Sequence, residues 1–399
     1  MMIAAAGWLV GCQPARHHRP AETSHPSAEE LVRAEADIRD RDIEFYERRV
    51  SEDSLGAIDR SKLAGLYMQR ARMSGSVGDN ERAERLARRS LVLRAERNEQ
   101  TFAILVGALL ARHDFPGALA VAKRAVSVDS LAPANLAMLG EVELEIGDYD
   151  SAAAHFSSIR FDGRDFTVAA RLARWRELTG RSDAARRLLR HAIRQVSQRD
   201  DLSRETVAWF HYRLAELELR LGNLDSADTS YRRGLALFPA DYRILGGLAR
   251  LAAARKQWSE AIDFGSRAIA IQLDPATLGT MSEAYRALGD TTQARQYARA
   301  MAVSALKQPG PIHRAWGLFL LDHGTQRDAA RVLMKARAEL KTRRDVYGYD
   351  LLAWALHRTG RNPEARTAME HALAQHTEDP QLDRHAAEIG QAFSRGQSR

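Results

Sequence analysis

Residues 147–152 read Gly-Asp-Tyr-Asp-Ser-Ala, and residues 222–227 read Gly-Asn-Leu-Asp-Ser-Ala. In both segments, residues that favour the start of a helix follow a glycine, and an alanine lies five positions after it. Related segments recur along the chain, beginning at His113, Gly147, Gly180, Gly222, Lys256, Gly289, Gly324 and Gly360. Their successive spacings are 34, 33, 42, 34, 33, 35 and 36 residues. A period of this kind indicates a repeat protein, in which the 399 residues need no single large core.

Each repeat has the pattern of two helices joined by a short turn. The residue that begins the turn is usually Gly, which supplies the left-handed backbone that ends a helix, and Asp, Asn or Ser then caps the second helix. Small residues recur where the two helices would cross: Ala118, Ala152, Ala185, Ala227, Ala261, Ala294 and Ala365, with Ala125, Ala192, Ala268 and Ala372 seven residues later. Larger apolar residues occupy i, i+3 positions of the first helix, as in Phe102/Leu105, Leu136/Leu139, Leu245/Leu248 and Tyr349/Leu352. The pattern predicts an all-α protein.

These units resemble the tetratricopeptide repeat, in which an aromatic residue, Leu-Gly, Tyr, Ala, an aromatic residue, Ala and Pro recur at fixed places. The matching residues are Leu136, Leu139-Gly140, Ala152 and Phe156 in the third unit, Leu214-Ala215, Ala227, Tyr231 and Pro239 in the fifth, and Tyr285 and Ala294 in the seventh. The resemblance implies an α-solenoid, a right-handed superhelix of about eight to nine helix pairs. The 42-residue step exceeds the period. Its extra residues, around Gln195–Arg204, are expected to lengthen both helices or to form a longer polar loop.

The pattern and the resemblance divide the chain into five parts. We expect a signal-like segment with a lipobox at 1–12, a disordered tether at 13–27, an N-terminal capping helix at 28–57, the solenoid at 58–378, and a C-terminal capping helix with a tail at 379–399. The tether contains three Pro and three His and almost no apolar residues, a composition typical of disorder.

Cys12 is the chain's single cysteine, so a disulfide framework within the chain, a Cys-rich zinc site and a CxxC redox pair are excluded. It directly follows an apolar stretch that ends Leu9-Val10-Gly11, and this stretch resembles the lipobox of bacterial lipoproteins. The resemblance implies cleavage before Cys12, acylation of its thiol, and attachment to the membrane through this lipid anchor alone. Gln13 in place of Asp implies an outer-membrane lipoprotein that faces the periplasm. A cytoplasmic protein in which Cys12 has no such role is the alternative.

The formal charge of +7 arises from 59 Lys+Arg against 52 Asp+Glu. Arg is dispersed among Glu and Asp at helical spacing, as in residues 81–89, which favours paired surface charges over a basic stripe. Aromatic residues do not alternate with these cations as they do in proteins that bind single-stranded nucleic acids. The sequence therefore predicts no nucleic-acid partner.

No arrangement of residues points to catalysis or to a cofactor. The chain lacks HExxH, GxxxxGK[ST], GxSxG, an EF-hand loop and a GxGxxG after a strand. His371 and His376 are five residues apart, which does not place two metal ligands on one helical face. Glu141, Glu143 and Glu145 fit a solvated helix face better than an acid–base site. We therefore expect no enzyme activity, no cofactor, no metal and no small-molecule substrate.

What remains is a binding scaffold for a protein or peptide. In tetratricopeptide proteins the concave face is lined by the first helix of each repeat, and residues at fixed positions there bind partners. In this sequence the positions are Glu141, Leu144, Arg174, Glu177, Trp209, Tyr212, Glu216, Arg220, Arg243, Arg250, Glu283, Arg286, Tyr347, Asp350, Trp354 and His357. Packing against a neighbouring helix is the alternative for Trp209 and Trp354. A soluble cytoplasmic adaptor or regulatory subunit with the same fold is the alternative function.

Overall fold

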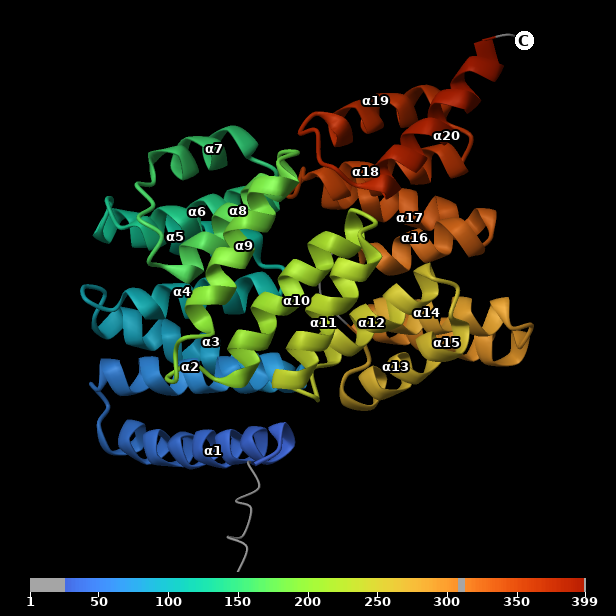
Figure 1. Cartoon of the computed structure of the whole chain (residues 1–399). Helices are drawn as coiled ribbons and strands as arrows, with labels where there is room; N and C mark the ends of the chain where they lie inside the picture. The colour runs from blue at the N-terminus through green and yellow to red at the C-terminus, as the bar shows by residue number, and fades with distance from the viewer. Residues whose placement is uncertain (1–25, 308–312, 398–399) are drawn as a thin grey trace, which may run out of the picture.

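The computed structural model describes residues 26–307 and 313–397, and in these ranges it contains twenty helices and no strand (Figure 1). The helices are α1 (Ala28–Glu52), α2 (Ala57–Ser74), α3 (Val77–Leu93), α4 (Glu99–Ala111), α5 (Phe115–Val128), α6 (Pro133–Ile146), α7 (Tyr149–Ser158), α8 (Phe166–Leu178), α9 (Ser182–Val196), α10 (Arg204–Arg220), α11 (Leu224–Leu237), α12 (Tyr242–Ala254), α13 (Trp258–Ile271), α14 (Pro275–Ala287), α15 (Thr291–Lys307), α16 (Arg314–His323), α17 (Gln326–Glu339), α18 (Val346–Arg358), α19 (Asn362–Leu373) and α20 (Pro380–Gln397).

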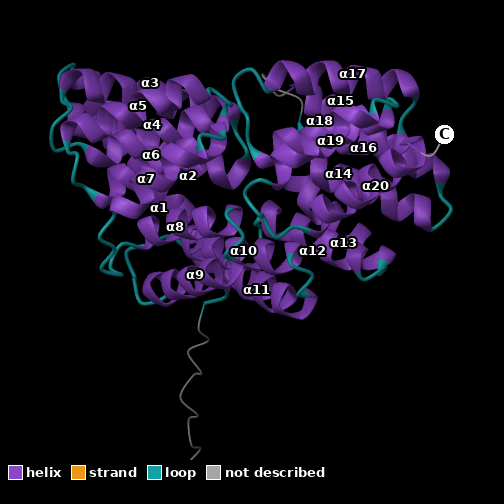
Figure 2. Ribbon diagram, turned by 90° about the horizontal axis from the view of Figure 1, so that it is seen from above, coloured by secondary structure: helices purple, strands orange, loops and turns teal. Residues whose placement is uncertain are grey.

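Helices α2 to α19 form nine consecutive pairs, and the even-numbered helix is the first of each pair. Seen from above, the pairs follow an arc from α2–α7 on one side, through α8–α13, to α14–α20 on the other (Figure 2). Helix α1 packs on α2, and α20 packs on α18 and α19. The expected all-α solenoid of helix pairs is confirmed.

The turns within the pairs have the backbone conformation that their sequence predicts. Seven of the eight residues that begin the recurring turn segments have a positive φ, from 58° at His113 to 84° at Gly289. His113 and Lys256 adopt this conformation although neither is a glycine. Gly324 is the exception: its backbone is extended, with a φ of −87°, and its amide donates a hydrogen bond to the carbonyl of Leu320.

The alanines predicted at the helix crossings are all buried, and none of the eleven is more than 3 % exposed. Their small side chains let the two helices of each pair approach closely. Larger apolar side chains fill the space between successive pairs, in several local clusters along the arc. The core is therefore distributed along the solenoid, as expected for a repeat protein.

The extra residues of the 42-residue step lengthen α10, which has 17 residues against 13 in α8 and in α12, and they also lengthen the loop between α9 and α10. Helix α9 ends at Val196 and α10 begins at Arg204. The backbone amide of Arg204 donates a hydrogen bond of 3.0 Å to the carboxylate of Glu35 in α1. The longer connection thus brings the start of α10 against the N-terminal helix.

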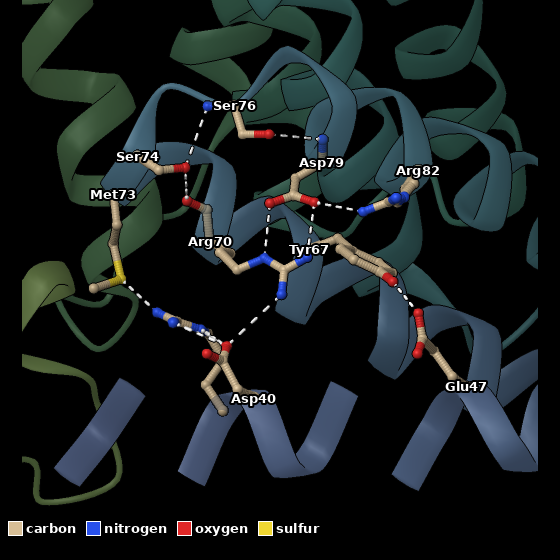
Figure 3. Close-up of polar contacts among 10 residues, drawn as sticks. Asp40, Glu47, Tyr67, Arg70, Met73, Ser74, Ser76, Asp79 and Arg82 are labelled. Carbon is tan, nitrogen blue, oxygen red and sulfur yellow. Dashed lines mark hydrogen bonds and ion pairs between the residues drawn. The ribbon is translucent and has the colours of Figure 1, made fainter. Parts of the chain in front are cut away.

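Polar contacts hold α1 across the first pair (Figure 3). Arg70 of α2 donates hydrogen bonds of 2.7 and 2.9 Å to Asp79 of α3, and lies 3.8 Å from Asp40 of α1. The hydroxyl of Tyr67 donates to Glu47 of α1. One guanidinium therefore connects three helices at this end of the solenoid.

Turns early in the chain contact loops almost 200 residues later. The amide of Arg344 donates a hydrogen bond of 2.8 Å to the carbonyl of Ile146. The amide of Val346 donates one of 2.9 Å to the hydroxyl of Tyr149, 197 residues away. The hydroxyl of Thr377 donates to the carbonyl of Leu178, 199 residues away.

Three glycines show how close these contacts are. A Cβ atom would lie 2.3 Å from the Gln272 side chain at Gly75, 2.3 Å from the Arg344 backbone at Gly147, and 2.3 Å from the His376 carbonyl at Gly180. The turns of the first, third and fourth pairs thus each contact a later loop, and the number of residues between turn and loop is nearly the same in all three cases. Successive turns of the superhelix are therefore in contact.

At the contact near Gly147, three carboxylates lie close to a single guanidinium group. The guanidinium of Arg343 lies 2.8 Å from Asp345, 3.4 Å from Glu339 and 3.8 Å from Glu145. Burial, with the negative charge of Asp345, raises the pKa of Glu339 to about 7 even though Arg343 is nearby. The folded protein therefore holds a proton on Glu339 at pH values where the unfolded chain does not.

We predict that Gly147→Ala destabilises the protein more than Gly222→Ala. Both residues have a positive φ, but nothing lies within 4 Å of a Cβ added at Gly222. The strained backbone alone should cost about 1–2 kcal/mol at Gly222, and the clash with Arg344 should raise the cost at Gly147 to about 3 kcal/mol or more. Urea unfolding of both variants measures the difference, and equal losses would show that the contact between the superhelical turns contributes no stability.

We predict that Glu339→Gln stabilises the protein more at pH 8 than at pH 5. A carboxyl whose pKa is raised on folding makes the free energy of unfolding fall as pH rises from its ordinary value of 4.5 to about 7. The side-chain amide of the variant does not titrate, so its free energy of unfolding does not fall in this way. The free energy of unfolding gained relative to wild type should therefore be about 1–3 kcal/mol larger at pH 8 than at pH 5. Urea unfolding at both pH values tests this, with the exposed Glu364→Gln as the control. A gain that is independent of pH would contradict it.

Candidate functional site

A groove of about 680 Å³ lies on the inner face of the solenoid. Its lining comes from the first helices of the first five pairs: Arg72 of α2; Ala103, Val106, Gly107 and Leu110 of α4; Glu141 and Glu145 of α6; Phe166, Thr167, Ala170, Arg171 and Arg174 of α8; and Glu205, Thr206, Trp209, Phe210, Tyr212, Arg213 and Arg220 of α10. This is the concave surface that repeats of this kind present to a partner.

One wall of the groove is aromatic. The ring of Phe210 lies edge-on to Phe166 at 5.7 Å and to Trp209 at 4.9 Å between centroids. Across from this wall, α4 contributes only small and aliphatic side chains. Rigid aromatic side chains in a concave surface offer apolar contact area at a low cost in conformational entropy.

The charges around the groove are paired across neighbouring helices. Arg171 donates a hydrogen bond of 2.8 Å to Glu141, and Arg72 lies 3.3 Å from Glu205. The positions of these guanidinium groups are fixed by carboxylates of the same protein. Polar groups of a partner would therefore meet fixed donors and acceptors of both signs.

The largest cluster of charges surrounds Glu177. Its carboxylate is 3.0 Å from Arg174 and 3.1 Å from Arg213, and it accepts a further hydrogen bond from Arg220. Glu177 is only 3 % exposed. Burial alone would raise the pKa of Glu177, but the three positive charges lower it to about 2. Glu177 therefore stays ionised and holds three arginines of two helices in place.

Five of the residues predicted to line the groove do so: Glu141, Arg174, Trp209, Tyr212 and Arg220. Glu177 lies directly behind them, and Leu144 is packed in the core at 1 % exposure. Arg213 was not among the predicted residues, although it is four residues after Trp209 and hence on the same helical face. Phe166 and Phe210, which form the aromatic wall, were not predicted either.

Further along the inner face, the predicted residues contact one another. Arg250 pairs with Glu216, which also accepts a hydrogen bond from Tyr231. Arg243 lies 2.9 Å from Glu205 and 2.7 Å from Asp241. These contacts join α10 to α12, and of the predicted residues Glu216, Arg243 and Arg250 contribute no lining to the groove.

Tyr347 lines a smaller cavity of about 430 Å³, together with Arg220, Arg314, Asp379, Pro380 and Gln381. Its ring lies between two guanidinium groups, with the centroid 4.7 Å from Arg314 and 5.9 Å from Arg220. Arg220 lines both cavities and so marks the boundary between them.

Asp350 and Trp354, also predicted to face the groove, lie in the interior because α20 covers them. Asp350 is fully buried, 2.6 Å from both Arg314 and His385. Trp354 is 2 % exposed, stacks on His385 at 4.3 Å, and donates a hydrogen bond to Asp322. Trp354 therefore packs against a neighbouring helix, which was the alternative to a position in the groove.

Three predicted residues lie near the ends of their helices, away from the groove. His357 contacts Asn362 at 3.0 Å, Glu283 lies 3.5 Å from His323, and the guanidinium of Arg286 lies 5.8 Å from the ring centroid of Phe319. Glu283 and Arg286 are exposed on α14.

Within residues 26–307 and 313–397, no group of three or more His, Cys, Asp or Glu side chains is placed to hold a metal ion. In the same part of the chain, no helix is both long and apolar enough to cross a bilayer. Cys12, predicted to carry a lipid, and residues 13–25 of the tether predicted at 13–27 lie outside the described residues.

Residues 105–165 and 212–276 match the tetratricopeptide repeat family. The first matched segment runs from within α4 to the loop before α8, and the second runs from within α10 to the start of α14. No curated protein matches the chain.

Solved structures with a similar arrangement of helices include PilW, described as a widely conserved type IV pilus biogenesis factor. That match has 14 % identity and a TM-score of 0.45, and covers 56 % of this chain and 99 % of that one. Yeast Tom70 has 13 % identity and a TM-score of 0.38, covering 93 % and 95 %. A human IFIT1 dimer with PPP-AAAA has 13 % identity and a TM-score of 0.46, covering 84 % and 94 %. At these identities and TM-scores, none of the three carries a functional inference.

We predict that Glu177→Ala costs about 3–5 kcal/mol of stability, because it leaves three arginines without their shared carboxylate. Asp183→Ala serves as the control, since Asp183 also pairs with an arginine, Arg186, but its side chain is 80 % exposed. That change should cost less than about 1 kcal/mol. Thermal and urea unfolding measure both, and a loss for Glu177→Ala as small as that of the control would show that the cluster does not organise the groove.

Proposed function

We propose that this protein is a non-enzymatic tetratricopeptide scaffold that binds a segment of a protein partner in the groove lined by α2, α4, α6, α8 and α10. The observation that carries the proposal is the aromatic wall of Phe166, Trp209 and Phe210 beside fixed Arg–Glu pairs in one concave surface. Trp, Tyr and Arg are the side chains that most often anchor protein interfaces.

The pairing of charges favours a protein partner over a nucleic acid. A phosphate backbone gains its affinity from cations that are free to replace counterions. Here Arg72, Arg171 and Arg213 each have a carboxylate within 3.3 Å. A peptide can contribute apolar side chains to the aromatic wall together with polar groups of both signs for the rim.

We further propose that the protein is a bacterial envelope lipoprotein, anchored to the outer membrane by Cys12 and facing the periplasm. The support is the lipobox-like sequence that ends at Cys12 and the polar tether that follows it. A tether of fifteen residues could extend roughly 50 Å, which would let the solenoid reach a partner away from the membrane surface. A cytoplasmic adaptor is the alternative.

We predict that a photo-crosslinking phenylalanine in place of Thr167, an exposed residue of the groove lining, captures the partner in cells. Trp209→Ala in the same chain should reduce the adduct at least about tenfold, because it removes part of the aromatic wall. The same crosslinker at Leu131, an 85 % exposed residue outside the groove, is the control. Mass spectrometry of the adducts provides the readout. Adducts that are identical at positions 131 and 167, or that survive Trp209→Ala, would contradict the groove as the binding site.

We predict that the full-length protein sediments with membranes and that Cys12→Ser moves it to the soluble fraction. The acyl chains attached at Cys12 account for the expected difference, since no helix of the described residues could take over as a membrane span. Fractionation and the intact mass of the purified protein test this. An unmodified thiol on Cys12 together with an unchanged distribution of Cys12→Ser would favour the cytoplasmic adaptor.

A further inference from the structure

A further cavity lies on the outer side of the arc, away from the groove. It measures about 440 Å³ and lies between α9 and α11, which Figure 2 shows on the outside of the arc, with α10 at its floor. Helix α10 contributes His211, Leu214 and Glu218 to the lining. These residues lie on the face of α10 opposite Trp209, which lines the groove. The outer cavity and the groove are therefore separate.

Three arginines line the outer cavity: Arg190 and Arg194 of α9, and Arg233 of α11. Within the described residues, Arg194 and Arg233 form no ion pair and no side-chain hydrogen bond. The guanidinium of Arg190 lies 4.0 Å from the carboxylate of Glu218, at the limit of an ion pair. Unlike the arginines of the groove, these three are therefore not held by carboxylates of the same protein.

The two carboxylates of the lining are paired with arginines outside it. Glu218 accepts hydrogen bonds of 2.6 and 3.0 Å from Arg186, and Asp225 lies 2.6 Å from Arg255. Arg186 also contacts Asp183, but the side chain of Asp183 is 80 % exposed and does not line the cavity. The positive charges of the three lining arginines therefore remain uncompensated inside the cavity.

A buried imidazole lies at the floor of the same cavity. His211 is 8 % exposed, yet neither of its ring nitrogens forms a hydrogen bond with the described residues. Burial, together with the positive charge of Arg233, lowers the pKa of His211 and favours the neutral ring. Buried polar groups normally have a hydrogen-bond partner, and a neutral imidazole carries one N–H donor. The imidazole therefore points to an acceptor atom supplied by a ligand.

The donors of the outer cavity match a phosphate group better than a carboxylate. A phosphate monoester has a charge of about −2 and three acceptor oxygens, and guanidinium groups bind it through charge-assisted hydrogen bonds. The hydroxyl of Ser226, which donates no hydrogen bond within the described residues, adds a neutral donor from α11. The apolar side chains of Ile193 and Leu214 also line the cavity, so there is room and contact area for the group that the phosphate esterifies.

We propose that the outer cavity binds the phosphate group of a phosphate monoester, which is either a soluble small molecule or the head group of a lipid. The phosphate oxygens accept hydrogen bonds from the three guanidinium groups and from the imidazole of His211. The esterified group packs against Ile193 and Leu214. Because this site lies on the other side of α10 from the groove, it does not depend on the partner proposed for the groove.

The test measures the binding of phenyl phosphate by isothermal titration calorimetry, with the full chain carrying Cys12→Ser so that no acyl anchor contributes. This protein should bind phenyl phosphate with a dissociation constant of about 1 mM or lower. Arg194→Gln and Arg233→Gln should each weaken binding at least about tenfold, because each removes a charge-assisted hydrogen bond. Arg187→Gln removes the same charge at an exposed position of α9 outside the lining, and it should change binding less than about twofold.

His211→Phe keeps a ring at the floor of the cavity but removes the donor. It should weaken the binding of phenyl phosphate at least about fivefold. It should not lower the melting temperature measured by circular dichroism, because the imidazole has no hydrogen bond to the described residues that could be lost. A lower melting temperature with unchanged binding would show that His211 is only structural and would contradict its place in the site.

Flotation with phosphatidylcholine vesicles, with and without phosphatidic acid, distinguishes the two sources of the phosphate. Flotation that requires phosphatidic acid and is lost in Arg194→Gln assigns the site to a lipid head group. Binding of phenyl phosphate without flotation assigns it to a soluble ligand. The proposal is overturned if neither phenyl phosphate nor the phosphatidic acid vesicles bind. It is also overturned if Arg187→Gln weakens binding as much as Arg194→Gln, which would show an unspecific basic surface.

Discussion

The contact between the Gly147 turn and the loop at Arg344 is the constraint on which the rest of the structure depends. The carbonyl of Ile146 and the amide of Arg344 form a hydrogen bond across almost 200 residues of chain, and neither backbone leaves room for a side chain at Gly147. Together with the close approach of Gly180 to the carbonyl of His376, this bond fixes the pitch of the superhelix. The pitch then decides which first helices face one another. The helices that face one another leave a groove of about 680 Å³ on the inner face.

Local features of the fold could be predicted from the sequence because they depend on neighbours in the chain. A left-handed turn residue, a capping residue and an alanine at a crossing act within one helix pair, so a period near 34 residues reveals them. The exception is Gly324, whose extended backbone the period does not report. The 42-residue step left a longer loop and longer helices open, and the structure has both a longer loop before α10 and a longer α10.

The site was less predictable, because position within a repeat does not determine burial in a closed superhelix. Arg174, Trp209, Tyr212 and Arg220 line the groove, as the repeat pattern implies. Asp350 occupies a first-helix position too, yet α20 buries it against Arg314 and His385. The abundant arginines have a related explanation: several join successive first helices through shared carboxylates, so the positive formal charge does not produce a free basic surface along the groove.

The measurement that tests this account most directly is the distance distribution between spin labels at two exposed positions on either side of the contact, Asp150→Cys and Thr342→Cys, in a Cys12→Ser chain. Double electron–electron resonance should give one narrow, short distance, which broadens when Gly147→Ala is added. A broad distribution centred at long distances in the doubly labelled chain itself, unchanged by Gly147→Ala, would show an open solenoid. That result would contradict the closed superhelix on which the shape of the groove depends.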